Sequence, residues 1–127
     1  MSQGKIWDQG KLMFITVEFK FEAAHKLLHY NGPCEKLHGH SYLLHVSILG
    51  EVDANGFVMD FGELKKIVGA SVISKLDHEY LNNIIEQPTA ENTIVWVWEQ
   101  LTKVSLPVYE LKLWETASSY VTYRGEK

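Results

Sequence analysis

Three histidines and a single cysteine are the residues of this chain whose types and spacing could do metal chemistry. His38 and His40 stand two residues apart, His25 lies upstream, and Cys34 comes shortly before the pair. In an extended strand, residues i and i+2 point to the same face, about 6.6 Å apart, so both members of the pair could reach one metal ion. Gly39 between them allows the backbone to bend or come close.

These residues favour a zinc site with three histidine ligands. Structural zinc sites take four protein ligands, whereas catalytic sites usually take three and a water molecule. His25 is the natural third ligand, and one cysteine cannot supply a thiolate cluster. The fourth position would then stay open for water or substrate. We call His25, His38 and His40 the histidine cluster. The alternative is that His38 and His40 are ordinary surface histidines, as is usual for a lone His-x-His pair in a strand.

Composition excludes several classes of protein. The 127 residues have the size of one domain with a real core. The formal net charge of -4 lacks the basic footprint typical of nucleic-acid binding. No apolar run approaches the ~20 residues that span a bilayer, and residues 1–11 lack the apolar segment of a signal peptide. We therefore expect a cytoplasmic protein with no nucleic-acid or membrane partner, in which the only cysteine stays a free thiol.

Two stretches of alternating apolar and polar residues predict the strands that position the histidines. Residues 12–25 alternate strictly, and His25 falls in phase with their apolar members. Residues 40–51 alternate in the same way, in phase with His38 and His40. The loop between them contains an Asn-Gly-Pro turn and brings the cysteine close to the second strand.

The middle of the chain predicts two helices. Asp60 and Glu63 form a capping-box pattern, and apolar residues at helical spacing follow as far as Leu76. Thr89, or a residue just after it, caps a second helix whose apolar stripe we interpret as core packing. Pro107 ends this helical region.

The last part of the chain predicts two more strands, the second over 120–123. In the first, Tyr109 and Glu115 are in phase with Leu111 and Leu113. A carboxylate on an apolar face is costly unless it is paired, so Glu115 is a candidate functional residue. The alternative is that the strand ends there and the carboxylate is solvated.

The order strand, strand, helix, helix, strand, strand predicts one α+β domain over 12–127, preceded by a leader over 1–11. We expect a four-stranded antiparallel sheet with two helices on one face. Such a sheet has two open edges and a second face that still carries apolar groups. Joining sheets between subunits would cover both, so we expect a homo-oligomer.

Five motifs in the same order resemble the 6-pyruvoyl-tetrahydropterin synthase and 6-carboxy-tetrahydropterin synthase family over residues 14–125. They are Phe21-Glu22-Ala23-Ala24-His25, Cys34-x-x-x-His38-Gly39-His40, Leu76-Asp77-His78, Pro88-Thr89-Ala90-Glu91-Asn92 and Trp114-Glu115-Thr116. The resemblance implies the tunnelling fold, in which the sheets of several subunits join into a barrel. It also implies trimers that pair into hexamers, with active sites at subunit interfaces.

The resemblance implies a role for each matching residue of the metal and proton-transfer sites. The histidine cluster matches the family's zinc ligands, and Cys34 matches its catalytic cysteine. Asp77 and His78 match the aspartate and histidine that complete a proton-transfer triad with the cysteine. Without the resemblance, we would interpret the Asp-His pair as a helix C-terminal pair favoured by the helix dipole.

The resemblance also implies a pterin substrate, 7,8-dihydroneopterin triphosphate. Glu115 matches the carboxylate that anchors the pterin ring, because a carboxylate can accept hydrogen bonds from the amino group and the ring N–H together. Thr89 and Glu91 lie where the family's pterin pocket is completed.

Glu35 adds a second motif, which points to a different product. The Cys34 motif resembles enzymes that form 6-pyruvoyl- or 6-carboxy-tetrahydropterin, whereas Glu35-x-x-His-Gly-His resembles variants that form 6-hydroxymethyl-dihydropterin for folate synthesis. The chain carries both motifs, although Glu35 could also be a solvated loop residue.

The short chain and tight loop resemble the bacterial or archaeal 6-carboxy branch. We therefore expect a zinc-dependent lyase that forms 6-carboxy-5,6,7,8-tetrahydropterin, with loss of triphosphate and acetaldehyde, in queuosine or 7-deazapurine biosynthesis. The alternatives are a 6-pyruvoyl-tetrahydropterin synthase, a dual-motif enzyme that forms 6-hydroxymethyl-dihydropterin, a zinc hydrolase, and a non-enzymatic pterin-binding module.

Overall fold

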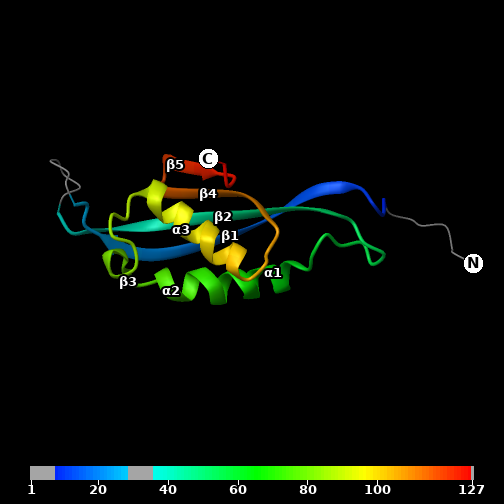
Figure 1. The fold of residues 1–127 in the computed structure, drawn as a ribbon, viewed down its shortest axis with the longest axis horizontal. Helices are drawn as coiled ribbons and strands as arrows, with labels where there is room; N and C mark the ends of the chain where they lie inside the picture. The colour runs from blue at the N-terminus through cyan, green and yellow to red at the C-terminus, as the bar shows by residue number, and fades with distance from the viewer. Residues whose placement is uncertain (1–7, 29–35, 127) are drawn as a thin grey trace, which may run out of the picture.

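The computed structural model describes residues 8–28 and 36–126. The elements in chain order are β1 Leu12–His25, β2 His38–Glu51, α1 Phe61–Val68, α2 Ser74–Leu76, β3 Glu79–Tyr80, α3 Ala90–Lys103, β4 Val108–Thr116 and β5 Ser119–Tyr123 (Figure 1). A π-helical turn, Gly69–Ile73, joins α1 to α2, and a 3-10 turn, Leu81–Asn83, follows β3. No helix in the described part of the chain is both long enough and apolar enough to cross a membrane.

The strands form one sheet in the order β3-β1-β2-β4-β5. The pairs β1–β2, β2–β4 and β4–β5 are antiparallel, which confirms the predicted four-stranded antiparallel sheet. The two residues of β3 add a short parallel strand beside Ala23 and Ala24. Pairing of β1 with β2 runs without a break from Leu12 opposite Glu51 to His25 opposite His38, so the alternation of side chains is kept along both strands.

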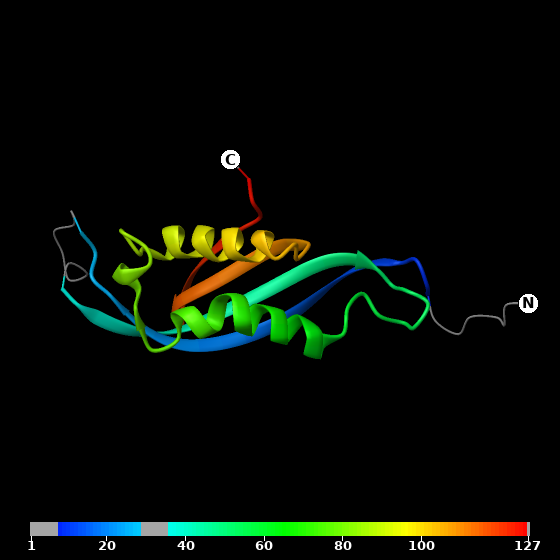
Figure 2. The ribbon, with the colours of Figure 1, turned by 60° about the horizontal axis from the view of Figure 1, so that its bottom comes forward.

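Both helical segments cover one face of the sheet, as predicted (Figures 1 and 2). Helix α3 packs against β4 and β5, while α1 and α2 pack against β1. The core between the layers is built from the in-phase apolar residues of the strands and the apolar stripes of the helices, among them Val17, Phe21, Leu44, Val46, Leu64, Val97 and Leu111. Burial of each side chain of this size contributes about 1.5–3 kcal/mol to the stability of the folded state. The strand ends that carry the histidines therefore extend from a well-packed layer.

Side-chain caps set where α1 and α3 begin. Oδ1 of Asp60 accepts a hydrogen bond from the Gly62 amide at 2.7 Å, and Oγ1 of Thr89 accepts one from the Asn92 amide at 3.0 Å. These contacts confirm the predicted helix starts, because N-cap side chains satisfy amides that lack a partner in the first turn. The Thr89 cap also fixes the position of Pro88, which contacts the histidine cluster.

A β-bulge in β4 corrects the predicted orientation of Tyr109. Ser47 pairs with Glu110 while Ile48 pairs with Val108, so Tyr109 is the extra residue of the bulge. Its side chain is 43% exposed, and its ring packs 4.9 Å from that of Phe14. The prediction that Tyr109 shares the apolar face was wrong, because one unpaired residue interrupts the two-residue period.

Candidate metal centre

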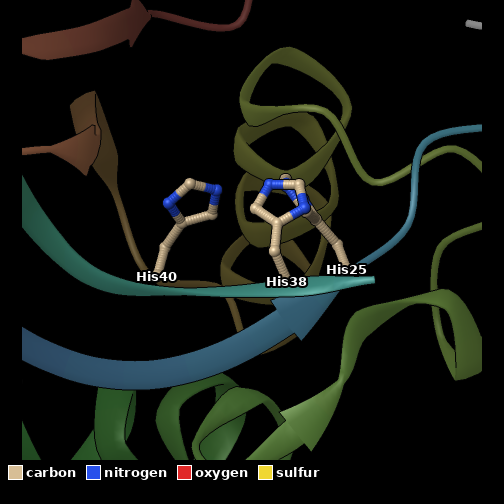
Figure 3. A group of neighbouring side chains, drawn as sticks. All are labelled: His25, His38 and His40. Carbon is tan, nitrogen blue, oxygen red and sulfur yellow. The ribbon is translucent and has the colours of Figure 1, made fainter. Parts of the chain in front are cut away.

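The histidine cluster lies at one end of the sheet, where β1 ends and β2 begins. His25 is the last residue of β1 and is paired directly with His38, the first residue of β2. His40 follows on the same face of β2, and the three rings stand together on one side of the strands (Figure 3). The two-residue period and the strand register therefore bring together side chains that a long loop separates in the sequence.

The ring nitrogens of the histidine cluster converge. Nε2 of His25 lies 3.1 Å from Nε2 of His38, and the three residues each offer a ligand atom within 4.8 Å of the others. The ring centroids are 4.6 to 4.9 Å apart. Two nitrogens bound to one tetrahedral zinc at about 2.0–2.1 Å lie roughly 3.3 Å from each other. The observed spacing fits a single ion of this kind.

Backbone carbonyls determine the tautomer of two of the rings. Nδ1 of His25 lies 2.8 Å from the carbonyl oxygen of Pro88, and Nδ1 of His38 lies 2.7 Å from that of Lys36. A carbonyl can only accept, so each Nδ1 carries the proton and each Nε2 presents a lone pair. Two lone pairs that face each other at 3.1 Å repel unless a cation lies between them. This arrangement fits a metal site.

His40 supplies a third nitrogen without a protein partner. Its Nε2 is buried and lies 3.1 Å from Oε1 of Glu115, but the alignment is not that of a hydrogen bond, and no described residue provides one. Burial lowers the pKa of His40; the Glu115 carboxylate opposes this, and His25 and His38 lower it further. A neutral imidazole with an unused buried nitrogen is suited to bind a metal.

Glu115 lies beside the histidine cluster on the face predicted from its phase in the strand. Its Oε1 is 3.1 Å from Nε2 of His40 and 3.8 Å from Nε2 of His25. Strand β4 continues to Thr116, and the Glu115 side chain is only 23% exposed. The alternative of a solvated carboxylate beyond the strand end is therefore wrong. The carboxylate offers two acceptor oxygens next to the converging imidazoles.

Asp77 and His78 form a close carboxylate–imidazole pair at the outer edge of β1. Oδ1 of Asp77 accepts from the Glu22 amide at 3.0 Å and lies 3.1 Å from Nδ1 of His78. The Glu22 hydrogen bond, with a smaller contribution from His78, lowers the pKa of Asp77. His78 has a φ of 60°, and its own amide donates to the Glu22 carbonyl. The pair is thus held to β1 by the backbone, and Nε2 of the imidazole has no hydrogen-bond partner among the residues that the structure describes.

The structure does not bring His78 into contact with the histidine cluster. A cavity of about 470 Å³ is lined by residues that include His78, Glu22, Ser41 and His40. Within residues 8–28 and 36–126, no hydrogen bond or ion pair connects His78 to the cluster. The imidazole of His78 is 79% exposed. It borders the same cavity as one ligand but projects toward solvent.

Cys34 and Glu35 lie outside the described residues, so their roles remain predictions. The start of the loop that contains them is nevertheless held in place by two amide side chains. Asn82 accepts from the Lys26 amide at 2.9 Å and donates to the Lys26 carbonyl at 2.7 Å. Gln87 accepts from the Leu28 amide at 2.6 Å and also donates to the Leu28 carbonyl.

Thr89 is the N-cap of α3 and Glu91 lies in its first turn, and their role in a pterin pocket remains a prediction. The hydroxyl of Thr89 is engaged as the helix cap, and Glu91 is exposed. Neither forms a hydrogen bond or ion pair with Glu115 among the described residues.

Two residues that contact the histidine cluster were not predicted from the sequence. Pro88 contributes its carbonyl oxygen to His25, and the hydroxyl of Tyr42 lies 3.3 Å from Nδ1 of the same histidine. No local pattern indicates a backbone carbonyl as a partner. The phase of Tyr42 with His38 and His40 in the second strand was the available signal.

Comparisons with known proteins agree along nearly the whole chain. The family described as 6-pyruvoyl tetrahydropterin synthase matches residues 14–126. The chain is 36% identical over 120 residues to 6-carboxy-5,6,7,8-tetrahydropterin synthase of Synechocystis sp., covering 88% of this chain and 93% of the relative. It is 42% identical over 105 residues to dihydroneopterin monophosphate aldolase of Pyrococcus furiosus, covering 80% and 88%. The structure of Caenorhabditis elegans 6-pyruvoyl tetrahydropterin synthase superimposes with a TM-score of 0.84 at 27% identity, covering 94% and 100%.

Proposed function

The chain belongs to the 6-pyruvoyl tetrahydropterin synthase family, and from this we propose that it is a zinc-dependent lyase acting on 7,8-dihydroneopterin triphosphate. The proposed product is 6-carboxy-5,6,7,8-tetrahydropterin, formed with loss of triphosphate and acetaldehyde, in queuosine or 7-deazapurine biosynthesis in the cytoplasm. The main support is the pair of facing Nε2 atoms of His25 and His38, with the unused Nε2 of His40 beside them. The relative that is itself a 6-carboxy-tetrahydropterin synthase supports the choice of product.

The histidine cluster is the proposed zinc site. Bound there, the ion would act as a Lewis acid that polarises the hydroxyl groups of the substrate side chain. The carbonyls of Pro88 and Lys36 hold the Nδ1 protons of two ligands, which keeps the Nε2 atoms oriented toward one point before the ion arrives. Preorganisation of this kind reduces the cost of ordering ligands on binding.

Glu115 is the proposed anchor of the pterin ring. Its carboxylate can accept two hydrogen bonds, from the amino group and from the ring N–H of a pterin. The position of Glu115 beside Nε2 of His40 supports this role, because a ring held there would place its side chain near the zinc site. Hydrogen bonds to a charged acceptor contribute about 1.5–3 kcal/mol, enough to select this ring orientation.

Cys34 and the Asp77–His78 pair are the proposed proton-transfer groups. Cys34, as a thiolate, would remove a proton from the substrate side chain, and a thiolate near zinc and histidine is more populated than the free pKa of about 8.5 allows. The Asp77 carboxylate, 3.1 Å from Nδ1 of His78, would hold the proton on that nitrogen and keep Nε2 available as the atom that takes or gives a proton. The lowered pKa of Asp77 keeps its carboxylate ionised for this purpose.

We propose that a second copy of the chain shields the proposed active site from solvent. His78 is 79% exposed in the single chain, whereas controlled proton transfer benefits from the exclusion of water. The sheet also ends in the open edge strands β3 and β5, which are available for pairing. We therefore assign the protein to a homo-oligomer, a trimer or hexamer, whose active sites lie at subunit interfaces.

A second candidate function is cleavage of the side chain to 6-hydroxymethyl-dihydropterin. Two observations favour it: Glu35 follows Cys34 directly, and the Pyrococcus furiosus relative, 42% identical, is a dihydroneopterin monophosphate aldolase. In this reaction Glu35 would serve as a second acid–base group.

Product identification tests these functions against each other. The zinc-loaded protein would be incubated with 7,8-dihydroneopterin triphosphate, and the products identified by mass spectrometry. We expect 6-carboxy-tetrahydropterin with release of triphosphate. A 6-pyruvoyl product or 6-hydroxymethyl-dihydropterin would correct the product within the same family. Release of phosphate with an intact side chain would instead indicate a zinc hydrolase, and binding without turnover a pterin-binding module.

A further inference from the structure

Tyr42 lies directly behind the histidine cluster, and we propose that it is a positioning residue of the zinc site. Its side chain is 1% exposed, and its hydroxyl lies 3.3 Å from Nδ1 of His25. Its ring meets those of His40 and His25 edge-on, with centroids 5.6 and 6.5 Å apart. The inference rests on the proposed function, since it needs a zinc ion at the cluster.

The N–H at Nδ1 of His25 has two acceptors, the carbonyl of Pro88 and the hydroxyl oxygen of Tyr42. The Pro88 carbonyl, 2.8 Å away, requires that Nδ1 of His25 be protonated. The Tyr42 oxygen must therefore act as a second, longer acceptor of the same N–H. Two acceptors on one side of the imidazole hold the ring in the plane they define and keep its Nε2 directed at the metal position. Outer-sphere partners of a ligating histidine act in this way on its tautomer and basicity.

The ring of Tyr42 is itself fixed by the sheet. Tyr42 is the cross-strand partner of Phe21, and the two rings stack at 4.9 Å with an angle of 7° between their planes. Both are almost fully buried. The hydroxyl consequently has one position relative to the end of β1, so it can impose an orientation on His25.

Substitution of Tyr42 by phenylalanine tests the role of the hydroxyl. The matched control is Thr93→Val, because Oγ1 of Thr93 is a buried hydroxyl with no hydrogen-bond partner among the described residues. Zinc affinity would be measured by competition with a chromophoric chelator, and ligand geometry from the visible spectrum of the cobalt-substituted protein. We expect Tyr42→Phe to weaken zinc about tenfold, the lower limit for an outer-sphere partner, and to alter the cobalt spectrum. Thr93→Val should match the wild type within about twofold.

The outcomes separate this inference from the proposed function. A wild-type protein that binds no zinc overturns both. A wild-type protein that binds zinc, with Tyr42→Phe equal to Thr93→Val in zinc affinity, overturns the positioning role alone.

A measurement on the wild type tests the inference even if Tyr42→Phe does not fold. In the zinc-bound protein, nitrogen-15 NMR should show the His25 proton on Nδ1, with a nuclear Overhauser contact to the Tyr42 ring. A proton on Nε2, or no such contact, contradicts the inference.

Discussion

Nε2 of His25 lies 3.1 Å from Nε2 of His38, although the two residues are 13 positions apart in the chain. They are directly paired in the β1–β2 register, and their Nδ1 atoms donate to backbone carbonyls. The loop between them carries Cys34. Zinc bound to both histidines would therefore tie together the two ends of the loop that holds the predicted catalytic thiol.

Removal of one histidine should abolish stable zinc binding. We expect one zinc per chain in the wild type, and a loss of affinity in His38→Ala of more than about 100-fold, beyond the cost of an outer-sphere change. Zinc content after dialysis, measured by atomic emission, checks this. The control is His45→Gln, because His45 contacts Glu18 and Trp114 and is not a member of the cluster. Equal zinc in His38→Ala and His45→Gln would contradict the site.

Removal of the thiol should separate catalysis from metal binding. In Cys34→Ala we expect turnover to fall by about 10²–10⁴-fold, the contribution typical of a positioned acid–base group, while zinc content stays at the wild-type level. Steady-state release of triphosphate and zinc analysis of the same samples provide the measurement. Full activity of Cys34→Ala would refute the thiol's role. A zinc hydrolase needs no thiol, so unchanged turnover in Cys34→Ser would favour that class.

Neutralisation of Glu115 should weaken the pterin complex. We expect Glu115→Gln to bind a pterin roughly 10–100-fold less tightly, because one charged acceptor is worth about 1.5–3 kcal/mol. Fluorescence titration of the zinc-loaded protein with neopterin measures this. Glu110→Gln is the control, since that carboxylate is paired with Arg124 at 2.9 Å. If Glu115→Gln instead loses zinc and keeps normal pterin affinity, the carboxylate supports zinc binding and does not bind the pterin ring.

Neutralisation of Glu35 should change the product ratio if both motifs are active. Glu35→Gln cannot transfer a proton, so we expect a selective decrease in 6-hydroxymethyl-dihydropterin with the 6-carboxy product retained. Quantitative mass spectrometry of both products checks this, with the exposed Glu51 at the far end of β2 substituted in the same way as a control. An unchanged ratio of the two products would indicate that Glu35 is a solvated loop residue.

The metal-free protein should lose stability as the pH falls through about 6.5. Burial lowers the pKa of His40 in the folded state, while the unfolded chain has the ordinary value of about 6.5. The unfolded state then binds more protons in this range, so the free energy of unfolding falls as the pH drops through 6.5 and levels off below the folded pKa. Urea denaturation at several pH values measures this. His40→Gln should show a shallower pH dependence, and an unchanged one would contradict the assignment.

Local patterns in the sequence were enough to predict which side chains share a face. The two-residue period of a strand placed His38 with His40 and Glu115 with Leu113. The structure agrees, because Glu115 lies beside His40 and His25. The caps at Asp60 and Thr89 marked the helix starts. These features follow from the geometry of neighbouring residues, so they can be derived without knowing how the chain folds back on itself.

Contacts between distant segments decided the rest. The pairing of His25 with His38, the Pro88 carbonyl on His25 and the Tyr42 hydroxyl beside it join residues from separate elements. The bulge that turns Tyr109 away from the core depends on how β4 meets β2. No single segment encodes such relationships, because each arises when two segments pack and satisfy one another's polar groups. The sequence alone thus determined the residue types of the site, and the tertiary structure determined that their nitrogens converge.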